Sequence, residues 1–167
     1  MSTTKSHEMA ISSLAVVDGS QRETNRNTLQ PILFDLIALG RIVKQLHWNV
    51  VGPHFRPLHL HLDEIHEVVE DAIDTVAERL TATGHTADGR LKATAENTEL
   101  DDVPEGFLVD DEVLRLASFN LRRAVELIRS RTEEIEDVDT ATADLLHQIE
   151  LDLEKHHWML EAQRVAK

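Results

Sequence analysis

The sequence predicts an all-α protein, a four-helix bundle with one long crossover between its second and third helices. Apolar residues recur every three or four positions in four separate segments, as in helices that bury one face. The connections between these segments are short, long and short, the order that a bundle with one crossover requires. At 167 residues the chain can bury one core without disulfides, and it contains no cysteine.

Residues 1–24 show no sustained periodicity and are rich in serine and threonine. We therefore predict a flexible N-terminal tail over residues 1–24, followed by a bundle domain over residues 25–165. The first helix is expected over residues 28–51, because Gly52 and Pro53 cannot continue it.

The second helix is expected over residues 57–84. Residues 81–110, rich in threonine, aspartate and glycine, form the long connection. Asp110 or Asp111 is expected to cap the third helix, and the fourth helix is expected over residues 139–164. Four helices joined in this way indicate a ferritin-like bundle.

The chain is strongly acidic, with 31 aspartates and glutamates against 17 lysines and arginines and a formal net charge of -14. Such a surface repels nucleic acid phosphates and attracts cations. A cation-handling function and adaptation of the whole surface to high salt, as in a halophile, are competing explanations. The acids are spread over the chain, which favours high salt as a large part of the cause. A protein that stayed folded and assembled at low salt would argue against that explanation.

Composition also limits the compartment and the metal chemistry. No apolar run approaches the length of a membrane span, and no signal peptide is apparent, so a cytoplasmic protein is expected. Without cysteine, any metal must be held by imidazole and carboxylate. That ligand set suits iron, manganese or zinc better than copper(I).

Side chains that bind metals gather at the end of the first helix and along the second. His47, His59 and Asp63 are expected to meet at the turn between these helices, whereas Asp74 and Glu78 lie one turn apart further along. Asp63 and Asp74 are separated by about 16 Å at 1.5 Å per residue, too far to bind one ion from one chain. Antiparallel pairing with the same helix of a second subunit would bring Asp63 near the partner's Asp74, which makes two composite sites per dimer.

The combined set of two imidazoles and three carboxylates suits Fe(II) and the Fe(III) that oxidation leaves. The expected chemistry is oxidation of Fe(II) by an oxygen species, which needs no protein nucleophile. Glu67 and Glu70 lie on the same helical stripe as the other acids. Mineral nucleation and a solvated helix face are equally good explanations for these two glutamates. Surface or packing roles are favoured over iron transfer for His54, His61 and His66.

The segment HWNVVGPHFRPLH, followed by Asp63, Asp74 and Glu78 at matching spacings, resembles the Dps miniferritins. The likeness covers most of residues 28–162, and its central block is long and specific. The resemblance implies a hollow, negatively lined shell of twelve four-helix subunits, a dodecamer. Trp48 matches a family tryptophan that lies beside the metal centre.

The resemblance also implies an activity and divides the ligands between subunits. Fe(II) would be oxidised, preferably by hydrogen peroxide, at ferroxidase centres between two-fold partners and stored as a ferric mineral. His47, His59 and Asp63 would come from one subunit, and Asp74 and Glu78 from its partner. Removal of Fe(II) and peroxide together would protect DNA from oxidative damage.

Two alternative functions remain open at this stage. Glu154 and His157 form a Glu-x-x-His pair, half of a di-iron site within one subunit, but the second helix lacks the matching half. A structural nucleoid protein that binds DNA directly is the alternative from another class. Direct DNA binding is disfavoured, because the chain lacks a lysine-rich tail and carries a net charge of -14.

Overall fold

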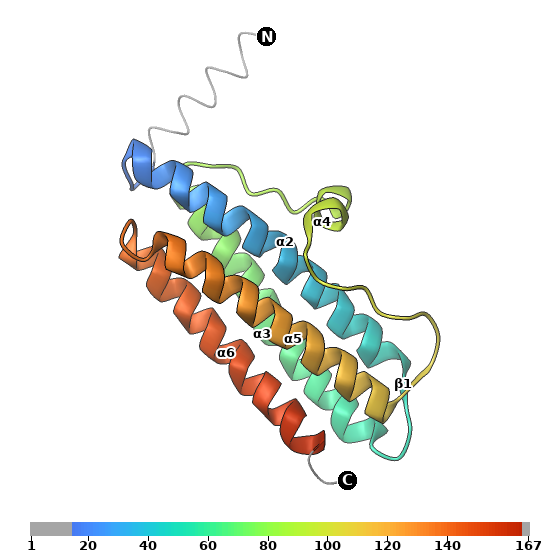
Figure 1. The fold of residues 1–167 in the computed structure, drawn as a ribbon. Helices are drawn as coiled ribbons and strands as arrows, with labels where there is room; N and C mark the ends of the chain where they lie inside the picture. The colour runs from blue at the N-terminus through green and yellow to red at the C-terminus, as the bar shows by residue number, and fades with distance from the viewer. Residues whose placement is uncertain (1–14, 165–167) are drawn as a thin grey trace.

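Four long helices form a bundle in the computed structural model, which describes residues 15–164 (Figure 1). α2 packs against α3 and α5 packs against α6, and each pair is joined by a short turn. The prediction of an all-α bundle is confirmed. The four helices are α2 (Gly19–Asn49), α3 (Phe55–Ala82), α5 (Asp110–Ile135) and α6 (Thr140–Arg164).

The first helix begins earlier than the sequence predicted. Residues 19–24, which we assigned to the tail, are helical, and α2 is well formed before it reaches Thr28. The Asp18 carboxylate accepts a hydrogen bond from the Gln21 backbone N–H, and the Gln21 side chain accepts one from the Asp18 N–H. Because the first turns of α2 are polar, no apolar stripe marked them. The rest of the predicted tail, residues 1–14, lies outside the described residues.

A connection of residues 83–109 joins α3 to α5. It contains a short helix, α4 (Leu91–Asn97), and a two-residue strand, β2 (Leu108–Val109). β2 pairs in parallel with β1 (Val50–Val51), which follows α2. Figure 1 shows the connection running alongside the bundle to the end where α5 begins. The sequence predicted neither α4 nor the strands, since two residues are too few to show a strand period.

The buried carboxylate of Asp35 on α2 fixes the middle of this connection. It accepts hydrogen bonds from the Thr98 hydroxyl at 2.9 Å and the Glu99 backbone N–H at 2.7 Å. The Arg131 guanidinium on α5 donates to the same carboxylate at 2.8 Å. A buried carboxylate is tolerated only with such partners, so the segment after α4 is bound to two bundle helices.

Asp110 does not cap α5, so that part of the prediction is wrong. Val109 is the N-cap residue, and α5 begins with Asp110 itself. The Asp110 carboxylate turns toward the α2–α3 turn, where the His54 backbone N–H donates to it at 2.8 Å. Gly52 permits this approach, since a Cβ there would lie 2.8 Å from the Asp110 carboxyl carbon. With a φ of +130°, Gly52 also adopts backbone angles that other residues rarely tolerate.

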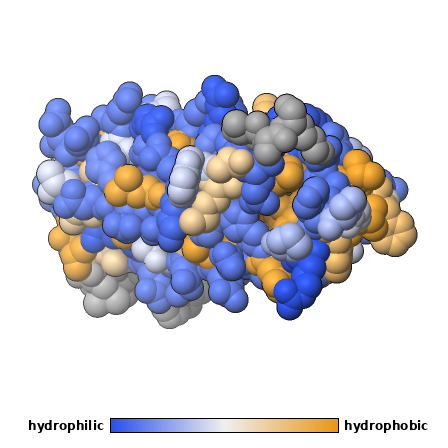
Figure 2. Space-filling view, turned by 90° about the horizontal axis from the view of Figure 1, so that it is seen from below, coloured by the Kyte–Doolittle hydropathy of each residue, from blue (hydrophilic) through white to orange (hydrophobic). Residues whose placement is uncertain are grey.

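The inner faces of the four helices form one apolar core. Outside it, hydrophilic side chains cover most of the face in Figure 2, and apolar residues appear there as separate patches. No helix within residues 15–164 is both long enough and apolar enough to cross a membrane. The largest fully buried side chains are Leu29, Ile32, Leu33, Leu36, Leu39, Leu46, Leu58, Leu62, Ile65, Leu80, Leu121 and Ile128.

Candidate metal centre

His47 and His59 come from two helices that the turn at residues 50–54 brings together. His47 is buried in the last turn of α2, and His59 is half-buried near the start of α3. Because α3 runs back along α2, the two imidazole rings lie face to face. Their centroids are 3.7 Å apart and their planes are inclined by 21°.

Each imidazole is held by the backbone of the other residue. Nδ1 of His47 lies 2.9 Å from the His59 carbonyl oxygen, and Nδ1 of His59 lies 3.0 Å from the His47 carbonyl oxygen. A carbonyl oxygen only accepts hydrogen bonds, so both Nδ1 atoms carry the proton. In the neutral rings both Nε2 lone pairs are therefore free. This is how metal-binding histidines are usually oriented.

Asp63 completes this group from the next turn of α3. The ammonium of Lys44 on α2 lies 2.8 Å from its Oδ1. The hydrogen bond from Lys44 lowers the pKa of Asp63 below its ordinary range, and the neighbouring histidines act in the same direction. Asp63 is therefore ionised at neutral pH. A cation that binds its carboxylate must compete with the lysine.

The role of Lys44 is the feature that sequence reasoning missed. Lys44 lies one helical turn before His47, and this spacing was the available signal. Its ammonium also lies 5.7 Å from the centroid of the Trp48 ring, whose side chain is exposed. A positive charge thus occupies the position beside Asp63 where a metal cation would be attracted.

His47, His59 and Asp63 form the tightest group of potential metal ligands. One ligand atom from each of the three residues lies within 4.8 Å of the others. Within residues 15–164 no other set of three or more histidines and acids meets that closely. The structure thus brings together three of the five predicted ferroxidase ligands, with two nitrogen lone pairs and one ionised carboxylate.

The other predicted ligands lie elsewhere on α3. Asp74 and Glu78 are exposed near the second half of the helix, outside the three-residue group. Glu67 is exposed as well. Glu70 accepts a hydrogen bond from the Arg41 guanidinium on α2 at 2.9 Å. Metal binding by these four carboxylates stays a prediction.

Glu154 and His157, the half-motif for a di-iron site within one subunit, are engaged differently. Glu154 forms an ion pair with Arg129 on α5. Nδ1 of His157 lies 3.1 Å from the Ser118 hydroxyl, also on α5. Both side chains therefore contribute to the packing of α6 against α5.

Comparison with known proteins places this geometry in a family. Residues 27–165 match the ferritin-like domain (Ferritin). Over 116 residues the chain is 37% identical to the DNA protection during starvation (Dps) protein of Brevibacillus brevis, covering 70% of this chain and 78% of that protein. The chain belongs to the Dps family of ferritin-like proteins.

Two further relatives agree with this membership. The chain is 35% identical over 134 residues to DNA protection during starvation protein 2 of Deinococcus radiodurans, which covers 80% of this chain but 56% of that longer protein. The structure of Dps from Microbacterium arborescens in the high iron form superposes with a TM-score of 0.85 at 28% identity. That match covers 89% of this chain and 97% of the other. The predicted ferritin-like fold is thus confirmed.

Proposed function

We propose that this Dps protein binds Fe(II), oxidises it and stores the ferric product inside a hollow homo-oligomer. The observation that carries the proposal is the group of His47, His59 and Asp63, with both Nε2 lone pairs free beside an ionised carboxylate. Imidazoles retain affinity for ferrous iron, and carboxylates stabilise the ferric product. Iron is here the substrate of the protein, and the oxidised iron must leave the site.

Three ligands are too few for iron, and a second subunit would supply the rest. Asp74 and Glu78 lie one turn apart on an exposed face of α3, as a contribution to a partner's site requires. Antiparallel packing of two α3 helices about a two-fold axis would place Asp74 and Glu78 of each chain at the partner's histidines. Two equivalent centres per dimer result, and six dimers would form the predicted dodecamer.

The proposed oxidant is hydrogen peroxide. Each peroxide molecule takes one electron from each of two ferrous ions and two protons from solvent, yielding two ferric ions and two water molecules. Delivery of both electrons to one peroxide molecule would break the O–O bond without release of a hydroxyl radical. Ferric iron then hydrolyses and collects as mineral, for which Glu67 and Glu70 are the proposed nucleation side chains.

Removal of Fe(II) and peroxide protects DNA chemically, and this role would place the protein in the cytoplasm. The relatives from Brevibacillus and Deinococcus carry a name that states DNA protection, and the Microbacterium structure is titled as a high iron form. Direct DNA binding is not part of the proposal. The net charge of -14 repels phosphate at ordinary salt.

Anaerobic titration of the assembled protein with Fe(II), followed by addition of peroxide, tests this proposal. Asp74→Ala is expected to lower Fe(II) affinity by at least about 10-fold, because a ligand of the composite centre is lost. The matched control is Asp71→Ala, which removes an exposed aspartate one turn earlier on α3. Fe(II) binding and peroxide-driven oxidation that are unchanged in Asp74→Ala would rule out the intersubunit centre.

A further inference from the structure

A second pair of histidines lies between α3 and α6. Nε2 of His61 is 3.2 Å from Nδ1 of His156, and the rings are tilted by 40° with centroids 5.4 Å apart. His156 is buried and His61 is half-buried. The Gln163 amide lies 3.2 Å from Nδ1 of His61. The proposed ferroxidase centre uses neither of these two imidazoles.

This pair is separate from the proposed ferroxidase centre. His61 follows His59 by two residues, which is about 200° around a helix, so the two imidazoles leave opposite sides of α3. His59 faces the end of α2, and His61 faces α6. The two sites can therefore be altered independently.

The spacing of the two nitrogens fits a shared cation. With metal–nitrogen bonds of about 2.1 Å, neighbouring ligands lie about 3.0 Å apart in octahedral and about 3.4 Å apart in tetrahedral geometry. The observed separation of 3.2 Å falls between these values. A cation could thus bind Nε2 of His61 and Nδ1 of His156 at their present spacing, once the rings turn so that both lone pairs point at it and not along the hydrogen bond between them.

The protons of the pair can be rearranged if the Gln163 amide gives up its hydrogen bond to the Met159 carbonyl oxygen. When the Gln163 amide N–H donates to Nδ1 of His61, the His61 proton is on Nε2 and donates to His156. Cation binding at Nε2 would move that proton to Nδ1. A half-turn of the Gln163 amide would then present its oxygen as the acceptor, the outer-shell arrangement that orients metal-binding imidazoles.

Two carboxylates stand on the same facing surfaces. Glu64 follows His61 by one turn of α3, and Asp152 precedes His156 by one turn of α6. The negative charges of Glu64 and Asp152 both act on His156. Lys155 opposes a cation, but the two carboxylates outnumber it.

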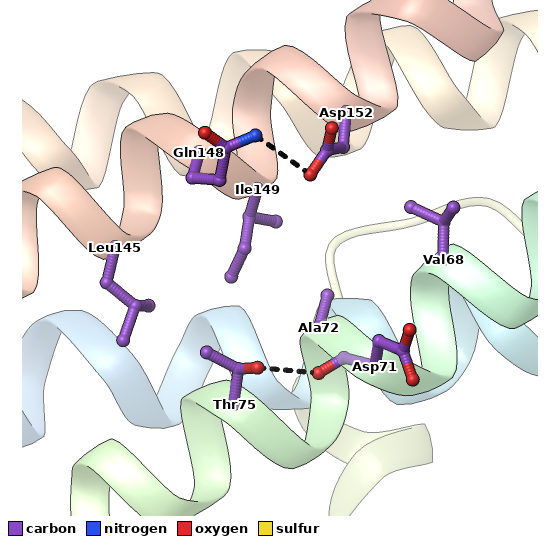
Figure 3. Close-up of a pocket in the computed structure, with 8 residues that line it drawn as sticks. All are labelled: Val68, Asp71, Ala72, Thr75, Leu145, Gln148, Ile149 and Asp152. Atoms are coloured by element: carbon purple, nitrogen blue, oxygen red, sulfur yellow. Dashed lines mark hydrogen bonds between the residues drawn. The ribbon is translucent and has the colours of Figure 1, made fainter.

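A groove lies between the same two helices, and neither histidine of the pair lines it. It has a volume of about 320 Å³ and runs between α3 and α6, with Val68, Ala72 and Ile149 pointing into it (Figure 3). Asp152 lies at one end of this groove, held by a hydrogen bond from Gln148 at 3.1 Å. Because Asp152 precedes His156 by four residues, this end of the groove begins about one turn of α6 from the pair.

We propose that His61 and His156 bind a divalent transition cation within a single chain, with the negative charges of Glu64 and Asp152 one turn away on each helix. Imidazole nitrogen is a ligand that Zn²⁺, Co²⁺ and Fe²⁺ accept, and water would fill the remaining coordination positions. Unlike the ferroxidase centre, this site needs no partner subunit. It goes beyond the proposed function and does not depend on it.

Calorimetric titration with Zn²⁺ in a His59→Ala background, which removes one ligand of the ferroxidase centre and weakens its binding, tests the proposal on assembled protein. His156→Gln and His61→Gln are each added to that background. Each is expected to lower the affinity of the pair for Zn²⁺ at least about 100-fold, so that the titration counts about one Zn²⁺ fewer per chain. Glutamine is chosen because it keeps the polar contacts between the helices. Circular dichroism and the size of the assembly check that each variant is folded. Because the two substitutions lie on different helices, the test still stands if one variant misfolds.

The matched control is His147→Gln in the same background. His147 is an exposed histidine of α6 that pairs with the Glu150 carboxylate at 3.9 Å rather than with a second imidazole. Zn²⁺ binding lost in both His61→Gln and His156→Gln but kept in His147→Gln supports the site. Binding retained in either pair variant, or lost equally in His147→Gln, overturns it. The Asp74→Ala titration with Fe(II) reports the ferroxidase proposal separately.

Discussion

The two ends of α3 carry the same kinds of metal-binding side chains in different surroundings. At the first end, Asp63 is held by Lys44 and lies against two imidazoles whose orientation the backbone fixes. Further along, Asp74 and Glu78 are exposed. The first group is assembled within one chain, whereas the second lies on an exposed face of the same helix. Under the proposed function, Asp74 and Glu78 would complete a centre on a partner subunit.

Mixing two inactive variants is the strongest test of this difference. Asp63→Ala and Asp74→Ala are expected to be nearly inactive alone, because every composite centre lacks one ligand. The two variants are then unfolded together and reassembled in equal amounts. A centre is intact only if the Asp74→Ala chain supplies Asp63 and the Asp63→Ala chain supplies Asp74. Random pairing makes that true for about a quarter of the centres.

Stopped-flow absorbance of the ferric product measures the recovered activity. Activity near a quarter of wild type would show that the two ends of α3 act across an interface. Mixtures as inactive as the separate variants would mean that each centre draws both aspartates from one chain. Reassembly of each variant alone is the control for partial refolding.

The second half of α3 is anchored to α6 through Arg79, and Asp139→Asn tests that anchor. The Arg79 guanidinium donates to the buried Asp139 carboxylate at 2.7 Å. Replacing Asp139 leaves a half-buried positive charge without its partner, which we expect to lower the free energy of unfolding by about 3 kcal/mol at neutral pH. Thermal unfolding followed by circular dichroism measures this loss, and Asp137→Asn, at an exposed neighbour, is the matched control.

The same variant carries a pH dependence with a defined sign. Burial by itself would raise the pKa of Asp139, but hydrogen bonds from Asn25, Thr142 and Arg79 outweigh it and keep the pKa below the ordinary value of 3.8. The ionised form is therefore favoured by folding. Its stabilisation is complete above the ordinary pKa and is lost as the pH falls through the lowered one. The gap between wild type and Asp139→Asn should narrow in acid, and a gap independent of pH would contradict this account.

The smallest expected effect concerns Lys44, which lies beside Asp63 at the first end of α3. Lys44→Gln removes the ammonium that competes for Asp63, so a divalent cation should bind about fivefold more tightly, equivalent to about 1 kcal/mol. Lys92→Gln, which breaks an exposed ion pair with Glu96 on α4, is the control. Anaerobic Co²⁺ titration compares them. Weaker binding in Lys44→Gln would mean that the lysine orients Asp63 for the metal and does not obstruct it.

Much of this architecture could be predicted because it follows from periodicity and spacing. The apolar stripes located the four bundle helices, and Gly52-Pro53 marked the turn that brings His47 to His59. The first turns of α2 escaped prediction because a capping box and polar contacts, not apolar burial, support them. Asp110 was misassigned for a related reason. Its carboxylate accepts a hydrogen bond from the turn at His54, which is distant in sequence, and no local pattern predicts that contact.

The candidate site was likewise predictable only where it depends on spacing within a helix. Helical spacing could place three ligands at one turn, but the reciprocal bonds of the two histidines to each other's carbonyl groups depend on how α2 and α3 pack. The His61–His156 pair joins segments far apart in the chain, so reading one helix at a time favoured a packing role for His61 and left His156 unassigned.

The pairing of β1 with β2 has a consequence for the timing of metal binding. These strands, with the hydrogen bond from His54 to Asp110, attach the start of α5 to the turn between the helices that carry His47 and His59. Closing a loop this long loses chain entropy once, during folding, and the ordered turn then persists. A cation arriving at this group would thus meet imidazoles already in position. Its binding would need little further ordering, which favours affinity.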